Sequence, residues 1–204
     1  MITLIDNYDS FTYNIYHSVC KNNKKVQILK NDELLSNYHK IINSEAVIIS
    51  PGPSNPFNAG ECLDLIDKIY SFMPIFGICL GHQIIGAFFK GKIKTLKHPY
   101  HGKISNIKIQ KKNKIFSNIK NEFQATRYHS LYVDKINKPE ELEITCISED
   151  DKVIMGLKHK LYNIKYDEPT LFNEIEYNDT NSKVLNTNLN IFGDSLIKQP
   201  FILF

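Results

Sequence analysis

At residues 76–83 the sequence reads Phe76-Gly-Ile-Cys-Leu-Gly-His-Gln83, and the rest of the chain is organised around this stretch. An apolar run, Met73 to Ile78, leads into a cysteine that has a glycine two residues away on either side. A second apolar stretch with helical length and spacing, Gln83 to Phe89, follows the cysteine. Strand, sharp turn and helix are the context in which a Gly-x-nucleophile-x-Gly pattern predicts a reactive side chain.

In such an elbow the nucleophile, here Cys79, occupies a strained turn that lifts its side chain clear of the sheet. Glycines at positions 77 and 81 remove β-carbons that would collide across so tight a turn. The positive end of the following helix points at the sulfur, so we expect it to lower the pKa of the thiol. The alternative is an ordinary buried cysteine, which a lone Gly-x-Cys-x-Gly pattern does not outweigh.

The composition is typical of a globular chain. Its 204 residues fit one domain with a sizeable core, and 42% of them are hydrophobic while 23% are charged. The net charge of +3 is small and the lysines are scattered, so we expect no nucleic-acid partner. No apolar stretch approaches the roughly 20 residues that span a bilayer. The opening Met1-Ile-Thr-Leu-Ile-Asp6 lacks the features of a signal peptide, and no membrane association is expected.

The cysteine pattern points away from zinc and disulfides. Cys20, Cys62, Cys79 and Cys146 are far apart and form no Cys-x-x-Cys pair. We therefore expect no metal, no cofactor and a location in the reducing cytoplasm.

Strands and helices alternate over the first 89 residues. Apolar runs predict strands at Ile2–Ile5, Val26–Leu29, Ala46–Ile49 and Met73–Ile78, and helices over 11–19, 34–42 and 61–72. Short turns between them indicate the α/β class, with an open, mostly parallel sheet flanked by helices. The turn cluster Ser50-Pro-Gly-Pro-Ser-Asn-Pro56 then shares the carboxyl edge of the sheet with the elbow, and open α/β sheets bind ligands at that edge.

Beyond Phe89 the pattern predicts an added region of antiparallel strands. Strands are expected at 92–96 and 104–110 with a turn between them, in a strand–turn–strand over 123–133, and in a hairpin of 142–148 with 153–158. From about Lys165 the chain becomes rich in asparagine, with three lysines against six acidic residues. We therefore divide the chain into a domain, 1–164, and a divergent tail, 165–204.

Four stretches resemble the class I (triad-type) glutamine amidotransferases. They are Leu4-Ile-Asp-Asn-Tyr-Asp-Ser-Phe-Thr-Tyr-Asn14, like the opening of the chorismate-utilising branch, Ser50-Pro-Gly-Pro53, like the oxyanion loop, Gly77 to Gln83, like the nucleophile elbow, and Arg127-Tyr-His-Ser-Leu131, like the glutamine-pocket strand. His101-Gly-Lys103 is a weaker fifth match. The order and spacing of these stretches also resemble the family, over about residues 1–164. The resemblance implies the flavodoxin-like fold of that family.

The resemblance also implies a role for individual residues. Hydrolysing a carboxamide needs a nucleophile and donors for the tetrahedral oxyanion. Cys79 is the implied nucleophile, forming a γ-glutamyl thioester, and the backbone N–H groups of Gly52 and Leu80 are the implied oxyanion donors. The implied glutamine contacts are Gly52, Pro53, Gln83, Ser130 and Leu131. The family assigns the role of base to neither His82 nor His129.

The chain departs from the family where the catalytic histidine and its orienting glutamate are expected. In the family, the region matching 155–164 leads into a Gly-Val-Gln-Phe-His-Pro-Glu-type motif. Here the chain reads Lys165-Tyr-Asp-Glu-Pro-Thr-Leu-Phe172, and no histidine follows His159. Glu168 is no substitute, because a carboxylate of ordinary pKa is a poor base for a thiol. The tail is either a frameshift or recombination product, which the abrupt change favours, or the end of a genuine inactive variant.

A smaller departure is Ser54, where the family often carries glycine. Serine adopts a strongly positive φ only with some strain.

The function implied by the resemblance is that of a glutaminase subunit. Such a subunit hydrolyses L-glutamine through the Cys79 thioester and delivers ammonia to a separate chorismate-binding synthase subunit, for anthranilate (tryptophan) or 4-amino-4-deoxychorismate (folate) synthesis. The alternative is a catalytically impaired binding or regulatory module with the same fold, because the catalytic histidine and glutamate are missing. A third hypothesis is a hydrolase of another Gly-x-nucleophile-x-Gly family.

Overall fold

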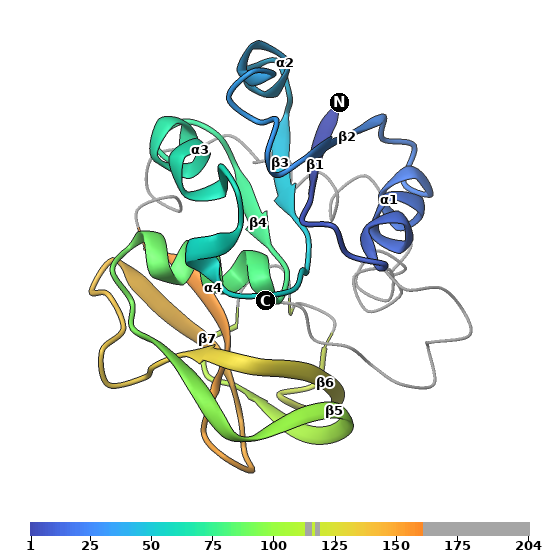
Figure 1. Cartoon of the computed structure of the whole chain (residues 1–204). Helices are drawn as coiled ribbons and strands as arrows, with labels where there is room; N and C mark the ends of the chain where they lie inside the picture. Colours follow the sequence, from blue (N-terminus) through green and yellow to red (C-terminus); the bar gives the residue numbers. More distant parts are fainter. Residues whose placement is uncertain (113–115, 117–118, 161–204) are drawn as a thin grey trace.

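The computed structural model describes residues 1–112, 116 and 119–160, which form two sheets on either side of one helix, α4 (Figure 1). In chain order the elements are β1 (Ile2–Asp6), α1 (Thr12–Cys20), β2 (Val26–Lys30), α2 (Tyr38–Ile42), β3 (Ala46–Ile49), η1 (Pro56–Asn58), α3 (Cys62–Ile69), β4 (Ile75–Gly77), α4 (Leu80–Phe88), β5 (Ile93–Ile109), β6 (Glu122–Val133), β7 (Leu142–Ser148) and β8 (Ile154–His159). The first sheet has the order β2-β1-β3-β4 and is parallel. The second has the order β6-β5-β7-β8 and is antiparallel. The predicted fold class is confirmed.

The parallel sheet is covered by helices on both faces. Side chains alternate along β1, so Ile2 and Leu4 pack beneath α1, whereas Ile5 faces α3 and α4 on the opposite side (Figure 1). All four residues of β3 are buried for the same reason. This double cover explains why these strands read in the sequence as continuous apolar runs.

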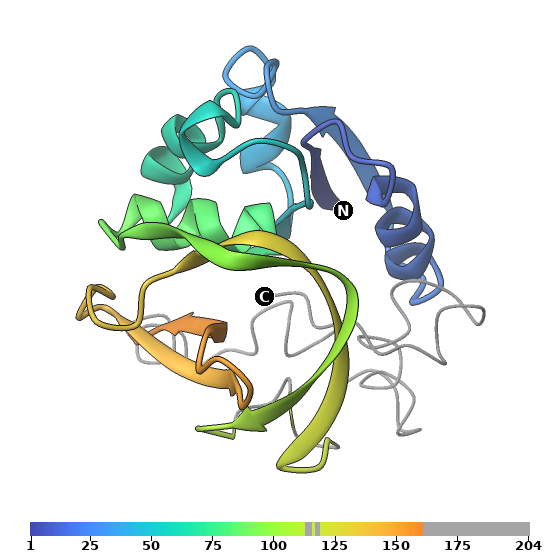
Figure 2. The same cartoon turned by 60° about the horizontal axis from the view of Figure 1, so that its bottom comes forward.

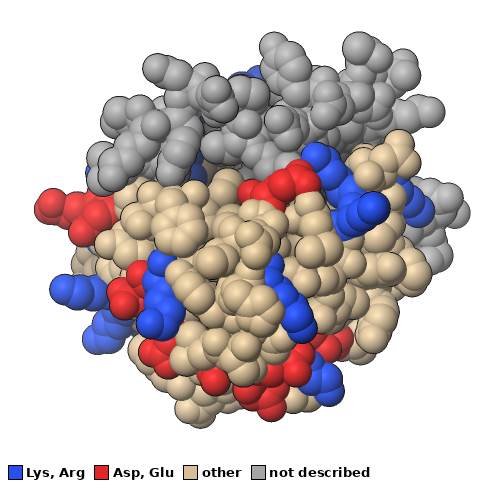
Figure 3. Space-filling view, turned by 90° about the horizontal axis from the view of Figure 1, so that it is seen from above, with Lys and Arg blue, Asp and Glu red and all other residues tan. Residues whose placement is uncertain are grey.

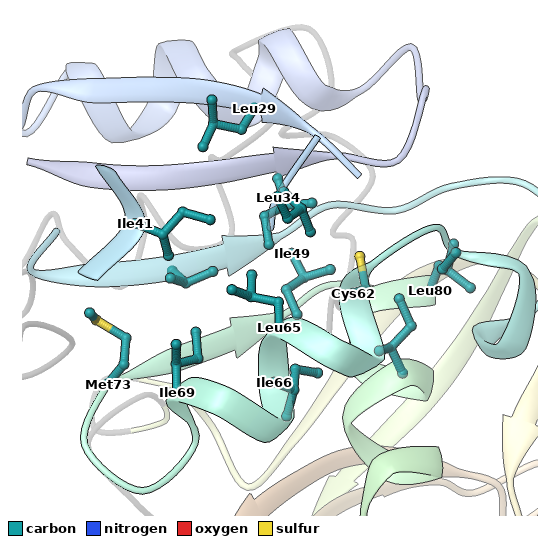
Figure 4. Packing of buried hydrophobic residues seen from close by; sticks show 14 residues of the cluster. Leu29, Leu34, Ile41, Ile49, Cys62, Leu65, Ile66, Ile69, Met73 and Leu80 are labelled. Atoms are coloured by element: carbon teal, nitrogen blue, oxygen red, sulfur yellow. The ribbon is translucent and has the colours of Figure 1, made fainter. Parts of the chain in front are cut away.

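Helix α3 packs as its apolar spacing predicts. Its buried residues are Cys62, Leu65, Ile66 and Ile69, a stripe one helical face wide. Figure 4 shows this stripe directed toward Ile49 of β3, at the centre of the larger core cluster. The helix predicted over 34–42 is shorter in the structure, because only α2 is helical and the preceding residues form turns.

In the antiparallel sheet two predicted turns, one between the strands at 92–96 and 104–110 and one within 123–133, were wrong. Strands β5 and β6 each run continuously through a segment that we expected to be a turn. Their pairing shifts register between residues 95 and 100 and again between 101 and 103. Gly102 sits at the second shift with φ of 73°, and a β-carbon there would lie 2.8 Å from the Tyr128 hydroxyl. Such bulges let a strand continue pairing across residues with turn character. The hairpin of β7 and β8 is present as predicted.

Helix α4 connects the two sheets. Figure 2 shows β5 and β6 as long curved ribbons that pass beside this helix. The helix contacts β3 and β4 of the parallel sheet as well as β5, β6 and β8 of the antiparallel one. Residues at the start of α4 therefore lie between the carboxyl edge of the first sheet and strand β6.

The described surface has mixed charge. On the face seen in Figure 3, basic and acidic side chains are interspersed around a broad uncharged area. This arrangement creates no extended field of one sign on that face. None of the helices in the described ranges is both long enough and apolar enough to cross a membrane.

Candidate active site

Cys79 stands at the carboxyl edge of the parallel sheet, between the end of β4 and the start of α4. Its backbone has φ of 52° and ψ of −102°, a combination that residues with a side chain rarely adopt. Because Cys79 caps α4, the N–H groups of the first helical turn have no partner within the helix. The strand, turn and helix predicted around this cysteine are all present.

The two glycines of the elbow are required by close backbone contacts. A β-carbon on Gly77 would lie 2.4 Å from the carbonyl group of Gly81. A β-carbon on Gly81 would lie 2.3 Å from the carbonyl oxygen of Ile49 on β3. Since real β-carbons do not approach backbone atoms so closely, the turn forms only with glycine at both positions.

The thiol of Cys79 is protonated at neutral pH. Burial raises the pKa of this thiol to about 11, although the backbone N–H of Leu80 acts in the opposite direction. The carboxylate of Asp9 raises the pKa further. We expected the start of the helix to lower the pKa, and this was wrong in its net sign because desolvation outweighs the helical N–H. The sulfur donates a long hydrogen bond, 3.9 Å, to the carbonyl oxygen of Tyr128 on β6.

The loop after β3 lies directly beside the elbow. A β-carbon on Gly52 would stand 2.8 Å from the side chain of Leu80 and 2.5 Å from that of Asn7. The two residues predicted to supply oxyanion donors, Gly52 and Leu80, are therefore neighbours, with no side chain on Gly52 to separate them. Pro53 is exposed next to them.

Our reading of the sequence missed the buried amide that holds this loop. The backbone N–H of Asn7 donates to Ser50 Oγ and its side-chain Nδ2 donates to the Ser50 carbonyl oxygen, both at 2.9 Å. Its Oδ1 accepts from Asn31 Nδ2 at 3.0 Å and from the Cys62 thiol at 3.4 Å. Within the opening stretch Asn7 is assigned no role of its own, because its hydrogen-bond partners lie far along the chain.

Gln83 of α4 and Leu131 of β6 are in direct contact. The side-chain Nε2 of Gln83 donates to the Leu131 carbonyl oxygen at 3.0 Å. Gln83 is buried, whereas Ser130 is exposed on β6. The predicted glutamine contacts thus come from the loop, the helix and the strand that surround Cys79.

Two histidines near the elbow are held in the neutral state. His129 accepts a hydrogen bond on Nε2 from Arg127 Nε, at 2.9 Å, so its proton is on Nδ1, 2.8 Å from the Leu131 carbonyl oxygen. Burial lowers the pKa of His129. Burial, reinforced by His129, lowers the pKa of His82 to about 3. Both nitrogens of His129 are engaged and His82 is a very weak base, which agrees with giving neither the role of base.

Within residues 1–112, 116 and 119–160, no imidazole or carboxylate forms a hydrogen bond with the Cys79 sulfur. The segment that replaces the family's histidine motif, together with the tail 165–204, lies outside the described residues. The same described ranges bring together no group of three His, Cys, Asp or Glu side chains that could hold a metal ion.

Alkylation of Cys79 should depend steeply on pH. With a pKa of about 11, only about one molecule in 10,000 carries the thiolate at pH 7, and the fraction rises about tenfold per pH unit. We expect the rate of reaction with iodoacetamide to rise in proportion up to about pH 10 in the folded protein, and to level off near pH 9 after denaturation. Peptide mapping separates Cys79 from Cys20. A plateau below pH 9 in the folded protein would contradict the raised pKa.

Replacement of Ser54 by glycine should stabilise the folded protein. Its φ is 71°, in the left-handed region that costs a residue with a β-carbon about 1–2 kcal/mol. Part of this gain is lost to the greater freedom of glycine in the unfolded chain, so we expect Ser54→Gly to raise the free energy of unfolding by about 0.5 kcal/mol. Urea denaturation measures the change, with Ser54→Ala as the control that keeps the β-carbon. A glycine variant less stable than the alanine variant would speak against the strain.

The fold and the elbow define a known class of protein. The sequence profile described as "Glutamine amidotransferase class-I" matches residues 3–165. The chain therefore belongs to the class-I glutamine amidotransferase family.

Named relatives lie within this family. The chain is 46% identical over 162 residues to anthranilate synthase component 2 of Cyanophora paradoxa, covering 79% of this chain and 84% of that protein. It is 43% identical over 164 residues to anthranilate synthase component 2 of Porphyra purpurea, covering 80% and 86%. A crystal structure of a glutamine amidotransferase from Thermotoga maritima has the same fold, with a TM-score of 0.66 and 15% identity over 97% of this chain and 98% of that one.

Proposed function

We propose that this chain is the glutaminase subunit of a chorismate-utilising synthase. It releases ammonia from L-glutamine and delivers it to a separate, chorismate-binding synthase subunit. Membership of the amidotransferase family supports glutamine as the substrate. The relatives named anthranilate synthase component 2 favour the anthranilate branch over 4-amino-4-deoxychorismate synthesis.

The placement of Cys79 carries this proposal. Its strained backbone directs the sulfur toward the space bordered by the Gly52 loop, the start of α4 and strand β6. Cys79, the neighbouring residues Gly52 and Leu80, and the buried side chain of Gln83 come from adjacent elements. This combination suits attack on a carboxamide.

In the proposed reaction the Cys79 sulfur attacks the carboxamide carbon of glutamine, and its proton passes through water to the departing nitrogen. The negative charge that develops on the amide oxygen is stabilised by the N–H groups of Gly52 and Leu80. The carbon–nitrogen bond then breaks, ammonia leaves with a proton, and water hydrolyses the thioester to glutamate. Gln83 and the backbone of β6 at Ser130 and Leu131 hold the amino-acid end of the substrate, and Pro53 borders it on the loop.

A second candidate function is a module that binds glutamine or the synthase subunit without turnover. Two observations favour it: burial raises the pKa of the Cys79 thiol to about 11, and the sulfur's hydrogen bond goes to a backbone carbonyl oxygen, that of Tyr128. The absence of any histidine after His159 in the sequence points the same way. Loss of the base from a catalytic triad lowers turnover by several orders of magnitude, while the oxyanion donors retain a residual rate.

Glutamate release by the full-length chain, mixed with its synthase subunit and chorismate, distinguishes these functions. Release that Cys79→Ser abolishes supports the glutaminase, and the identity of the aminated product separates the anthranilate and aminodeoxychorismate branches. Binding of glutamine without release supports the module. Cleavage of simple esters or peptides without action on glutamine would make the chain a hydrolase of another kind.

The nucleotide sequence after codon 164 provides an independent check. A shifted frame that encodes Phe-His-Pro-Glu would identify the tail as a lesion in an amidotransferase gene. Its absence from every frame would favour the non-catalytic module.

A further inference from the structure

A charged cluster is centred on the first residue of the candidate glutamine-pocket strand, and the proposed reaction gives it no role. Its centre is Arg127 of β6, whose side chain has no exposed surface. The Nη1 and Nη2 atoms of Arg127 donate to the two carboxylate oxygens of Asp151, at 3.1 Å and 2.9 Å. The guanidinium carbon lies 3.6 Å from the centre of the Tyr100 ring on β5. Because burying a charge is costly, this paired and stacked geometry fixes the orientation of the arginine.

Nη1 of this arginine also donates to Ser105 Oγ, at 3.3 Å, and Nε is directed at His129. Arg127 Nε donates to His129 Nε2, and since a guanidinium cannot accept a hydrogen bond, this nitrogen of the imidazole carries no proton. The proton of the neutral ring is therefore on Nδ1, which donates to the Leu131 carbonyl oxygen at 2.8 Å. The arginine thus determines which tautomer the histidine adopts.

The Leu131 carbonyl oxygen is also the acceptor for Gln83, at 3.0 Å. One carbonyl group therefore receives a donor from β6 itself and another from α4. Hydrogen bonds run without a break from Asp151, in the turn between β7 and β8, to Gln83 beside the elbow. The chain of contacts ends on the two residues, Gln83 and Leu131, that are proposed to hold the amino-acid end of glutamine.

We propose that Arg127 and His129 are positioning residues that set the amino-acid end of the glutamine pocket. They hold the Leu131 carbonyl group in place, and this group holds the amide of Gln83. Without the donor from His129, the Leu131 carbonyl group loses one of its two side-chain donors, although pairing with β5 still holds the strand. The carbonyl and the amide of Gln83 bonded to it are then less firmly oriented, so substrate affinity falls while the elbow is unaffected. This role rests on the proposed binding of glutamine.

We call the hydrogen bonds that run from Arg127 through His129 to the Leu131 carbonyl oxygen the relay. Two substitutions of His129 separate its bond to Arg127 from its bond to Leu131. Asparagine places an amide nitrogen near the position of Nδ1 and can still donate to Leu131. Glutamine places its amide oxygen near the position of Nε2, so it can accept from Arg127 but does not reach Leu131 as a donor. Isothermal titration calorimetry of the full-length chain with L-glutamine compares the variants. We expect His129→Gln to weaken binding about tenfold, the effect of one hydrogen bond, and His129→Asn by less than about threefold.

Controls distinguish positioning from a general structural role. Alkylation of Cys79 by iodoacetamide needs no glutamine pocket and should proceed at the same rate in both variants and in the unaltered chain. Unchanged affinity in His129→Gln, or equal losses in both variants, would overturn the positioning role.

The NMR resonances of the Gln83 side-chain amide test the relay without substrate. They should shift in His129→Gln and remain near their original positions in His129→Asn. If the unaltered chain fails to bind glutamine, the proposed function fails, whereas these resonances still decide the relay. Resonances that do not respond to His129→Gln would overturn the relay, whatever the binding result.

Discussion

Replacement of Gly81 by alanine is expected to lower the free energy of unfolding by about 3–5 kcal/mol, at the upper end of single-substitution effects. The added β-carbon would lie 2.3 Å from the carbonyl oxygen of Ile49 and 3.0 Å from its carbonyl carbon. Ile49 belongs to β3, which pairs with strands on both sides and cannot move away. The helix would have to separate from the sheet, and this loss exceeds the gain of about 1 kcal/mol that alanine brings to a helix.

Gly86, in the same helix, provides the matched control. A β-carbon there would approach a side-chain methyl of Val133 at 2.5 Å, and its nearest neighbours are all atoms of that side chain. Rearrangement of one side chain relieves such a contact, so we expect Gly86→Ala to cost less than about 2 kcal/mol. Urea unfolding followed by circular dichroism compares the two variants. Gly86→Ala being the more destabilising variant would contradict the backbone clash at Gly81.

Replacement of Cys79 by glycine is expected to stabilise the fold and to remove its thiol chemistry. The φ of 52° and ψ of −102° at this position carry about 1–3 kcal/mol of strain for a residue with a β-carbon. Alanine at position 79 keeps the strain, so Cys79→Gly should be more stable than Cys79→Ala by about 1–2 kcal/mol. Elsewhere glycine is usually the less stable of the two by about 0.5–1 kcal/mol.

The comparison of these two variants separates the effect of the backbone conformation from the effect of losing the sulfur. Both lack the sulfur, so neither should be labelled by a glutamine analogue that carries a reactive ketone, and any glutamate release should fall to background. Denaturation curves then report the strain, less the cost of about 0.5–1 kcal/mol that glycine's greater freedom in the unfolded chain adds. An alanine variant that is as stable as the glycine variant would show that the elbow is relaxed.

The parallel half of the fold could be predicted because its signals are local. Strands buried on both faces appear in the sequence as apolar runs. The spacing of Cys62, Leu65, Ile66 and Ile69 likewise predicts one buried face of a helix. The antiparallel half could not be predicted to the same degree. Residues 97–103 contain Pro99 and Gly102 and have the composition of a turn, yet pairing with β6 keeps them in one strand. The strength of that pairing depends on residues far along the chain.

The candidate site divides in the same way. Cys79 stands in a pattern of residue types that itself predicts a nucleophile, whereas Gly52, Gln83 and Leu131 become candidates through the resemblance of short stretches to the family. The hydrogen bonds of Asn7 to Ser50 and of Arg127 to Asp151 join residues that are 43 and 24 positions apart. The sequence does not show that these polar side chains are buried. The same applies to the pKa of Cys79, because the burial that raises it depends on how distant segments of the chain pack around the elbow.

The protonated thiol of Cys79 also determines how the site responds to oxidants. Peroxides and disulfides react with thiolates, and an unperturbed cysteine carries a few per cent of thiolate at pH 7. With its pKa raised to about 11, Cys79 carries about 300-fold less, and its oxidation slows in proportion. In the resting protein the sulfur of Cys79 is therefore kept as the protonated thiol, which reacts slowly with oxidants. Damage by peroxide is confined to the moments in which the proton has been removed.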